Sequence, residues 1–193
     1  MICLDEMGPE SAKSFPGRRV VRSDPGGQRR TRATQEIDYG RRGFGYVFGV
    51  FAPATGEAFT APYDRRTTAN WVDFLERVEG WLDPATERVY AVLDNLRAHR
   101  AVDVLLWALA HPRWEFVFQP TYAAYLNLIE PWWNILRSLA LKGRRFETWE
   151  QVCAAVDAAT RYWNAHRHPF VWGRRTRRHP ARPTGVTRLP LPT

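Results

Sequence analysis

The chain has 193 residues, of which 45% are hydrophobic and 13% aromatic, a composition typical of one packed globular domain rather than two. Lys and Arg number 28 against 20 Asp and Glu, which gives a formal net charge of +8. Because arginine is abundant and suits forked contacts to phosphate, this charge favours a nucleic-acid partner over a membrane surface. No apolar run has the length of a secretory signal or a membrane span, so we expect a cytoplasmic protein without membrane attachment.

The amino-terminal part begins with a very short apolar run that ends at Asp5. We expect a short strand there, broken at Gly8 and Pro9. Residues 14–42 are rich in Pro, Gly and Arg and show little periodicity. They are predicted to form a long basic loop that serves as a contact surface.

The middle of the chain alternates between strand and helix patterns. Two strands, 46–52 and 57–63, flank the turn signal "PATG" and predict a hairpin. An amphipathic helix follows in "TTANWVDFLERVEGWLD", with apolar residues at three- and four-residue spacing. Residues 89–93 are a continuous apolar run, which predicts a buried strand.

The carboxy-terminal half is predicted to be mainly helical. A helix that stops before Pro112 precedes one more buried strand in "WEFVFQP". Two helices are then expected in "NLIEPWWNILRSLALKG" and "TWEQVCAAVDAATRYWNAHR". The Arg- and Pro-rich residues 173–193 have too few apolar side chains to pack, which favours a flexible basic tail.

Three acidic residues lie where predicted elements begin or end. Asp5 and Asp94 each follow an apolar run, and Pro131 places Glu130 in the opening turn of a helix, where proline is tolerated. Each position also has an ordinary explanation. An Asp before an Asn is common turn and capping chemistry, and a Glu in the first turn complements the helix dipole.

The order of the elements favours a metal site. If the strands that precede Asp5 and Asp94 are parallel neighbours, both acids emerge at the same edge of the sheet. Carboxylates that close repel each other unless a divalent cation lies between them, and oxygen ligands suit Mg²⁺ or Mn²⁺. With Glu130 they would hold two ions, which can activate a water or hydroxyl and stabilise the leaving oxygen of a phosphodiester.

Three stretches resemble the catalytic blocks of the DDE transposases of the mariner superfamily, in its bacterial insertion-sequence branch of the six-thirty type. The stretches are "CLDEMGP" at 3–9, "VLDNLRAHR" at 92–100 and "QPTYAAYLNLIEPWWNILR" at 119–137. The resemblance runs from about residue 1 to residue 174. The 36 positions from Asp94 to Glu130 are close to the family's spacing.

This resemblance implies a ribonuclease H-like α/β fold over residues 1–172, with a central mixed five-stranded sheet and helices on both faces. It implies that Asp5, Asp94 and Glu130 are the catalytic, metal-binding acids, with two Mg²⁺ or Mn²⁺ ions as cofactors. Family members cleave DNA at transposon ends and join the freed 3′-hydroxyl to target DNA, acting at least as dimers. We therefore expect transposon-end and target DNA as partners, and a homodimer.

Basic residues in the loop and near the second and third blocks are the candidates for DNA contact. They are Arg18, Arg19, Arg29, Arg30, Arg41, Arg42, His99, Arg137, Arg144 and Arg145. For His99 a capping or surface role is an alternative. Trp132 and Trp133 could stack on bases, although two adjacent aromatics are more often one core residue and one partly exposed residue.

Complete family members carry helix-turn-helix domains before the catalytic domain, whereas Met1 here is four positions before Asp5. We expect the catalytic half alone, from a split or degenerate reading frame, paired with a separately encoded helix-turn-helix part. The alternative is an inactive DNA-binding remnant or regulatory fragment. A host ribonuclease H or resolvase fits the fold but matches the third block less well.

Overall fold

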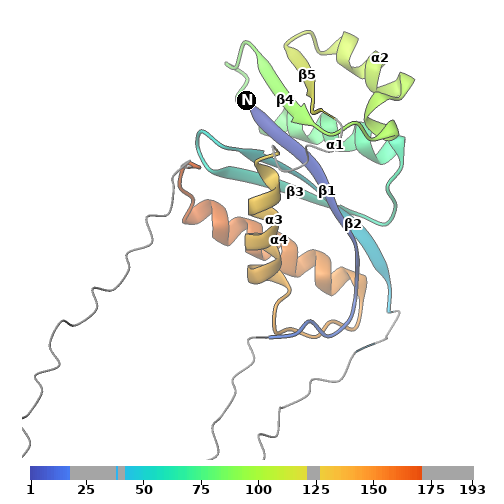
Figure 1. The fold of residues 1–193 in the computed structure, drawn as a ribbon, viewed down its shortest axis with the longest axis vertical. Helices are drawn as coiled ribbons and strands as arrows, with labels where there is room; N and C mark the ends of the chain where they lie inside the picture. Colours follow the sequence, from blue (N-terminus) through green and yellow to red (C-terminus); the bar gives the residue numbers. More distant parts are fainter. Residues whose placement is uncertain (18–37, 39–41, 121–126, 171–193) are drawn as a thin grey trace, which may run out of the picture.

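The computed structural model describes residues 1–17, 38, 42–120 and 127–170. Five strands form one sheet in the order β3-β2-β1-β4-β5 (Figure 1). β1, β2 and β3 are antiparallel neighbours, whereas β4 runs parallel to both β1 and β5. The predicted mixed five-stranded sheet is confirmed. Its strands are β1 (Ile2–Ser11), β2 (Phe44–Ala52), β3 (Glu57–Tyr63), β4 (Val89–Leu93) and β5 (Trp114–Phe118).

Four α-helices and one short 3₁₀ helix accompany the sheet. They are α1 (Thr68–Trp81), η1 (Arg97–Arg100), α2 (Val102–Ala110), α3 (Ile129–Ala140) and α4 (Trp149–Ala165). Thr67 and Thr148 cap α1 and α4, because each side chain accepts a hydrogen bond from a backbone N–H of the first turn. Pro131 is the third residue of α3, which confirms its predicted place in the opening turn. No helix in the described ranges is long and apolar enough to cross a membrane.

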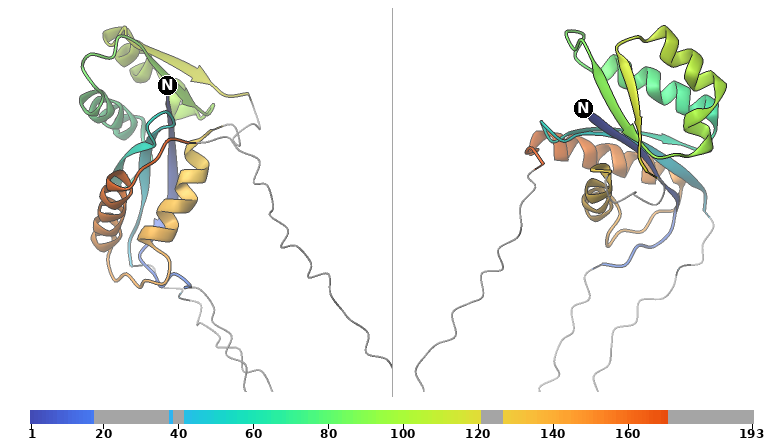
Figure 2. Two further views of the ribbon diagram at one scale, coloured as in Figure 1. Left: turned by 90° about the vertical axis from the view of Figure 1, so that its left-hand side faces the viewer. Right: turned by 45° about the horizontal axis from the view of Figure 1, so that its top comes forward.

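The two faces of the sheet carry separate cores, and alternation along β1 assigns its residues between them. Ile2 and Leu4 pack with α1 and α2, whereas Cys3 and Met7 pack with α3 and α4. Figure 2 shows α1 and α2 grouped around β4 and β5, and α3 and α4 beside the other strands. The expected helices on both faces are therefore present. By the same alternation Asp5 belongs to the α3 face and Glu6 to the α1 face.

The first strand is longer than the sequence predicted. Gly8 and Pro9 do not end it, because β1 continues to Ser11 with an irregular register between Met7 and Glu10. Gly8 has a φ of 141°, and a Cβ there would lie 3.0 Å from the carbonyl oxygen of Gly45. Only glycine lets the strand pass this irregularity, so the expectation of a short, broken first strand is wrong.

Most of the predicted basic loop at 14–42 and the whole predicted tail at 173–193 lie outside the described residues. Where the loop begins, Ser14 bridges to Arg145 and its backbone N–H donates to the carboxylate of Asp38. These contacts attach the start of the loop to the connection between α3 and α4.

Candidate active site

Asp5 and Asp94 are placed by the parallel pairing of β1 with β4. The register pairs Ile2 with Ala91 and Cys3 with Val92, and Asp5 and Asp94 each lie two positions beyond the last pair. They are close enough for the charge of Asp94 to raise the pKa of Asp5. Asp94 directly follows the last residue of β4. The two carboxylates therefore emerge together where the strands separate, as the sequence predicted.

The amino-terminal end of α3 brings Glu130 to the same place. Asn127, which is buried, donates from its side-chain amide to the carbonyl oxygen of Leu4 at 2.9 Å. Its own backbone carbonyl accepts from Glu130 at 3.1 Å. Asn127 thus ties the first turn of α3 to the strand residue that precedes Asp5. Its side-chain oxygen also accepts a hydrogen bond from the backbone N–H of Ile129, the first residue of α3, at 3.4 Å.

Asp5 has an environment that disfavours its charge. Opposite it on β2 lies Gly49, where a Cβ would come within 2.3 Å of the Trp133 ring, so the indole covers the sheet beside the carboxylate. Burial raises the pKa of Asp5 from 3.8 to about 7, and the charges of Glu6, Glu130 and Asp94 act in the same direction. One hydrogen bond, from the backbone N–H of Glu6 at 2.8 Å, opposes the shift.

A buried histidine connects Asp94 with the other face of the sheet. Nδ1 of His99 lies 2.8 Å from Oδ1 of Asp94, and Nε2 lies 3.3 Å from Oε1 of Glu6. Burial alone lowers the pKa of His99, but the two carboxylates outweigh it and raise the pKa from 6.5 to about 9. Contact with this imidazolium lowers the pKa of Asp94. His99 therefore acts as a fixed cation between two acids.

The role predicted for His99 as a DNA contact is corrected by this geometry. Its side chain is fully buried, and its ring lies 4.0 Å from the Trp71 ring, centroid to centroid. Both ring nitrogens face carboxylates, so neither is available to a phosphate. No local pattern could predict this arrangement, because Glu6, the second partner of His99, lies 93 positions away in the chain.

The other predicted DNA contacts fall into two groups. Arg18, Arg19, Arg29, Arg30 and Arg41 lie outside the described residues. Among the rest, Arg42 pairs with Asp38 and Glu147, Arg145 with Glu147, and Arg137 with Glu10 at 3.1 Å. Arg144 is exposed. These ion pairs hold three of the four described arginines to the protein's own acids.

Two other features of the site were not predicted. Trp132 and Trp133 are both buried, so neither presents a ring to a base. Arg66, between β3 and α1, is exposed and close enough to Asp94 to help lower its pKa. The sequence offers only a weak signal for the position of Arg66 near Asp94. The adjacent Arg65 is equally basic, so the sequence does not indicate which of the two arginines lies near the site.

The donor set suits a hard divalent cation. Asp5, Asp94 and Glu130 offer carboxylate oxygens, and their mutual repulsion, visible in the raised pKa of Asp5, is what a cation would relieve. In the described ranges no three His, Cys, Asp or Glu side chains are gathered closely enough to form a finished metal site. Binding would therefore draw the three carboxylates closer together.

Comparison with known proteins assigns the chain to a family. The sequence pattern of the DDE superfamily endonucleases matches residues 1–153. The insertion element IS630 uncharacterized 39 kDa protein of Shigella sonnei is 20% identical over 111 residues, which are 58% of this chain and 32% of that protein. The chain thus spans about a third of the length of this curated relative.

Solved structures of the Mos1 transposase share the fold. Its paired-end complex with left transposon end matches with a TM-score of 0.63 and 19% identity, over 88% of this chain and 48% of that one. Its strand transfer complex matches with a TM-score of 0.60 and 18% identity, over 86% of this chain and 47% of that one. This likeness identifies the ribonuclease H-like fold, and the match over residues 1–153 shows that the chain belongs to the DDE superfamily endonucleases.

Proposed function

We propose that this chain is the catalytic domain of a DNA transposase, which cleaves and joins DNA strands with divalent metal ions. The observation that carries the proposal is the meeting of Asp5, Asp94 and Glu130 at one place, where burial and like charges raise the pKa of Asp5 to about 7. Bringing like charges together in a buried place lowers the stability of the fold, and acidic groups with such perturbed pKa values are typical of functional sites.

Asp5, Asp94 and Glu130 would hold Mg²⁺ or Mn²⁺, two ions in the form we favour. The metal would lower the pKa of a bound water and stabilise charge on the leaving oxygen. A water molecule would attack phosphorus in line and release a 3′-hydroxyl, which would then attack a phosphodiester of the target DNA. The Mos1 transposase has been solved with Mn and with Mg, which supports the choice of cations.

Neighbouring residues would hold the acids in position. The His99 imidazolium fixes Asp94 from the buried side, which leaves the other faces of that carboxylate to a cation. Asn127 keeps the first turn of α3, and with it Glu130, against β1. The Trp133 ring keeps water from one side of Asp5, so the electrostatic attraction of Asp5 for a cation is screened less.

DNA would approach along the exposed face of α3. A shallow hollow there is lined by the polar residues Asn134, Arg137, Ser138 and Lys142 and by the apolar residues Phe15, Pro16 and Leu141. Glu130 and Ser138 are eight residues apart on the helix, a rise of about 12 Å, so the hollow lies within a few nucleotides of the proposed metal site. These polar and basic side chains suit the phosphate backbone, which positions DNA without reading its sequence.

The same proposal includes four further points. They are transposon ends as the substrate, assembly as a homodimer, a separately encoded helix-turn-helix partner and a cytoplasmic location. The complex of Mos1 transposase with a left transposon end supports the first. The net charge of +8 supports a polyanionic substrate in general.

The test is nicking of supercoiled DNA by the purified chain with Mn²⁺, with Mg²⁺ and with chelator. We expect nicking that needs metal and is lost in the variants Asp94→Asn and Glu130→Gln, while DNA affinity stays within about twofold of that of the wild type. The matched control is Glu87→Gln, an exposed acid on the connection before β4. Metal-dependent nicking that survives Glu130→Gln would contradict the proposal, and DNA binding without nicking would favour an inactive remnant.

A further inference from the structure

The connection from β3 to α1 places an arginine next to the acids of the candidate active site. The Trp71 ring of α1 lies 4.0 Å from the ring of His99, whose Nδ1 is 2.8 Å from Oδ1 of Asp94. The backbone N–H of Trp71 donates to the carbonyl oxygen of Thr67 at 3.0 Å, so Thr67 lies one helical turn earlier. Arg66 directly precedes Thr67 and therefore lies at the end of α1 beside His99 and Asp94. The contact with His99 chiefly lowers the pKa of Asp94, and the charge of Arg66 acts in the same direction.

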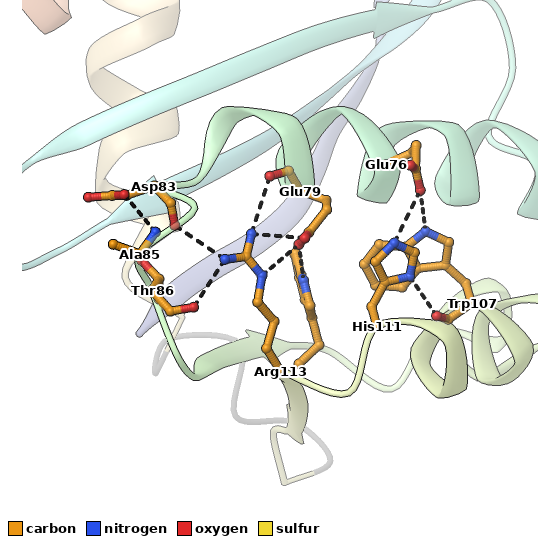
Figure 3. Close-up of polar contacts among 9 residues, drawn as sticks. Glu76, Glu79, Asp83, Ala85, Thr86, Trp107, His111 and Arg113 are labelled. Carbon is orange, nitrogen blue, oxygen red and sulfur yellow. Dashed lines mark hydrogen bonds and ion pairs between the residues drawn. The ribbon is translucent and has the colours of Figure 1, made fainter.

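Polar contacts farther along α1 hold the helix in place (Figure 3). Glu76 accepts a hydrogen bond from the indole N–H of Trp107 at 2.8 Å. Glu79 accepts one from the indole N–H of Trp114 at 2.6 Å and pairs with Arg113 at 2.9 Å. Because α1 cannot shift along the sheet without breaking these contacts, its first turn has a fixed place beside the acids.

The backbone and side chain of Arg66 are held as well. The side-chain amide of Asn70 donates to the carbonyl oxygen of Arg65 at 2.7 Å, and Thr67 accepts from the backbone N–H of Asn70 at 3.2 Å. The guanidinium of Arg66 lies over the ring of Tyr46 on β2, with Cζ 5.7 Å from the ring centroid. Such a cation–π contact uses the flat face of the guanidinium and leaves its N–H groups to other acceptors. Arg66 is therefore exposed but oriented.

The chain's own acids do not pair with Arg66. Arg42 and Arg137 form ion pairs with carboxylates, whereas none of the ion pairs among the described residues includes Arg66. The first turn of α1 carries no acidic residue either. A guanidinium has five donors and no acceptor, so it cannot bind a metal ion. An oriented, unpaired guanidinium beside a proposed metal site suits an anion that reaches the site, and phosphate takes two of its N–H groups at once.

We propose that Arg66 binds a phosphate of the DNA strand that enters the candidate active site. The inference rests on the proposed function, because that function supplies the DNA. Residues of α1 and α3 pack on opposite faces of the sheet. Arg66 would therefore hold the DNA backbone from the α1 side, while the hollow on α3 holds it from the other side. A strand held from both sides of the acids is aligned for in-line attack at the phosphate between them.

The first measurement is DNA binding by the full chain in chelator, which needs no catalytic activity. Fluorescence anisotropy gives the affinity for a short duplex at several salt concentrations. We expect Arg66→Ala to reduce the slope of log K against log salt by about 1, the effect of losing one phosphate contact. The matched control is Arg65→Ala, which removes the same charge from the neighbouring exposed position and should change the slope by less than about half as much. An unchanged slope in Arg66→Ala, or equal changes in the two variants, would overturn the proposal.

The second measurement is the rate of nicking of supercoiled DNA with Mn²⁺ at saturating concentrations of the chain. We expect a fall of about tenfold or more in Arg66→Ala and a change within about twofold in Arg65→Ala. Arg66→Lys should recover only part of the rate, because an ammonium group keeps the charge but cannot make the paired hydrogen bonds.

Calorimetric titration with Mn²⁺ separates a contact with DNA from support of the acids. Removing a positive charge near Asp94 reduces the repulsion of a cation, so Arg66→Ala should bind Mn²⁺ at least as tightly as the wild type does. Weaker Mn²⁺ binding by Arg66→Ala would show that Arg66 supports the acids, and would overturn the proposal. Circular dichroism confirms that each variant is folded.

These measurements also distinguish the phosphate contact from the proposed chemistry. A wild-type chain whose DNA binding depends on Arg66, but which does not nick, would support the contact and contradict the proposed function. A chain that nicks at the wild-type rate in Arg66→Ala would overturn the contact and leave the proposed function standing.

Discussion

At the scale of single residues, the buried ion pair of His99 with Glu6 gives the sharpest prediction. The Glu6 side chain is 3% exposed, so His99→Ala leaves a buried carboxylate without its counter-charge. We expect a loss of about 3 kcal/mol in the free energy of unfolding, measured by urea denaturation at pH 6. Adding Glu6→Gln removes the unpaired buried charge and should recover part of the lost free energy of unfolding.

The pH dependence of that effect has a definite sign. Because the folded-state pKa of His99 is raised from 6.5 to about 9, its contribution is complete below pH 6.5 and is lost as the pH rises through 9. The cost of His99→Ala should therefore shrink between pH 6 and pH 9.5. A double variant as unstable as the sum of the two single variants would contradict the coupling.

Asp5 leads to the opposite expectation, a gain in stability on removing the residue. With its folded-state pKa raised from 3.8 to about 7, the folded chain holds this proton more tightly than the unfolded chain, so stability falls as pH rises from 4 to 7. In chelator at pH 8, Asp5→Asn should raise the free energy of unfolding by up to about 4 kcal/mol, and the gain should vanish near pH 4.

Thermal unfolding with and without Mn²⁺ extends this prediction to the metal. Cation binding should raise the melting temperature of the wild type at pH 8, because it relieves the repulsion at Asp5, and should leave that of Asp5→Asn nearly unchanged. Equal stability of the two chains in chelator at pH 8 would show that Asp5 carries no such cost.

At the scale of elements, the hydrogen bond by which Asn127 holds α3 against β1 can be tested directly by mutation. Asn127→Ala leaves the buried carbonyl of Leu4 without this donor, at a cost of about 1–3 kcal/mol in unfolding free energy. Nicking should fall further than stability explains, because Glu130 loses its fixed place beside Asp5. Asn70→Ala is the matched control, since Asn70 makes the same kind of hydrogen bond, to the carbonyl of Arg65, on the exposed surface.

Elements with a local signal were predictable, and those that depend on distant partners were not. The hairpin of β2 and β3, with its turn signal, and the capped helices α1 and α4 occur where the sequence predicted them. The length of β1 was missed because Gly8 and Pro9 normally end a strand, and only the β2 backbone beside them lets β1 continue. The parallel pairing of β1 with β4 could only be assumed from the sequence, as the condition under which Asp5 and Asp94 share one edge of the sheet.

The same distinction holds for the site. Asp5, Asp94 and Glu130 could be proposed because acids at element ends have a recognisable pattern. The burial of His99 could not, since it requires Glu6 from β1 and Trp71 from α1 to close around one ring. Nor could local sequence show that Arg42 pairs with Glu147 and Arg137 with Glu10, since each partner lies more than 100 positions away.

At the scale of the whole molecule, the net charge of +8 predicts DNA affinity that falls steeply with salt. Lys142 and Arg144 are exposed near the end of α3, so the double variant Lys142→Gln with Arg144→Gln should reduce the slope of log K against log salt by about 2. Arg88→Gln, on the connection before β4, should change the slope much less. Fluorescence anisotropy with a short duplex, in chelator, provides the measurement, and an unchanged slope in the double variant would exclude this part of the surface.

The central claim is that Asp5, Asp94 and Glu130 act together as one metal site, and calorimetric titration of the chain with Mn²⁺ tests it most directly. We predict saturable binding by the wild type and by Glu87→Gln, and a loss of at least about tenfold in affinity in each of Asp5→Asn, Asp94→Asn and Glu130→Gln. The measured stoichiometry gives the number of ions. Mn²⁺ binding that is the same in all four variants as in the wild type would contradict the account.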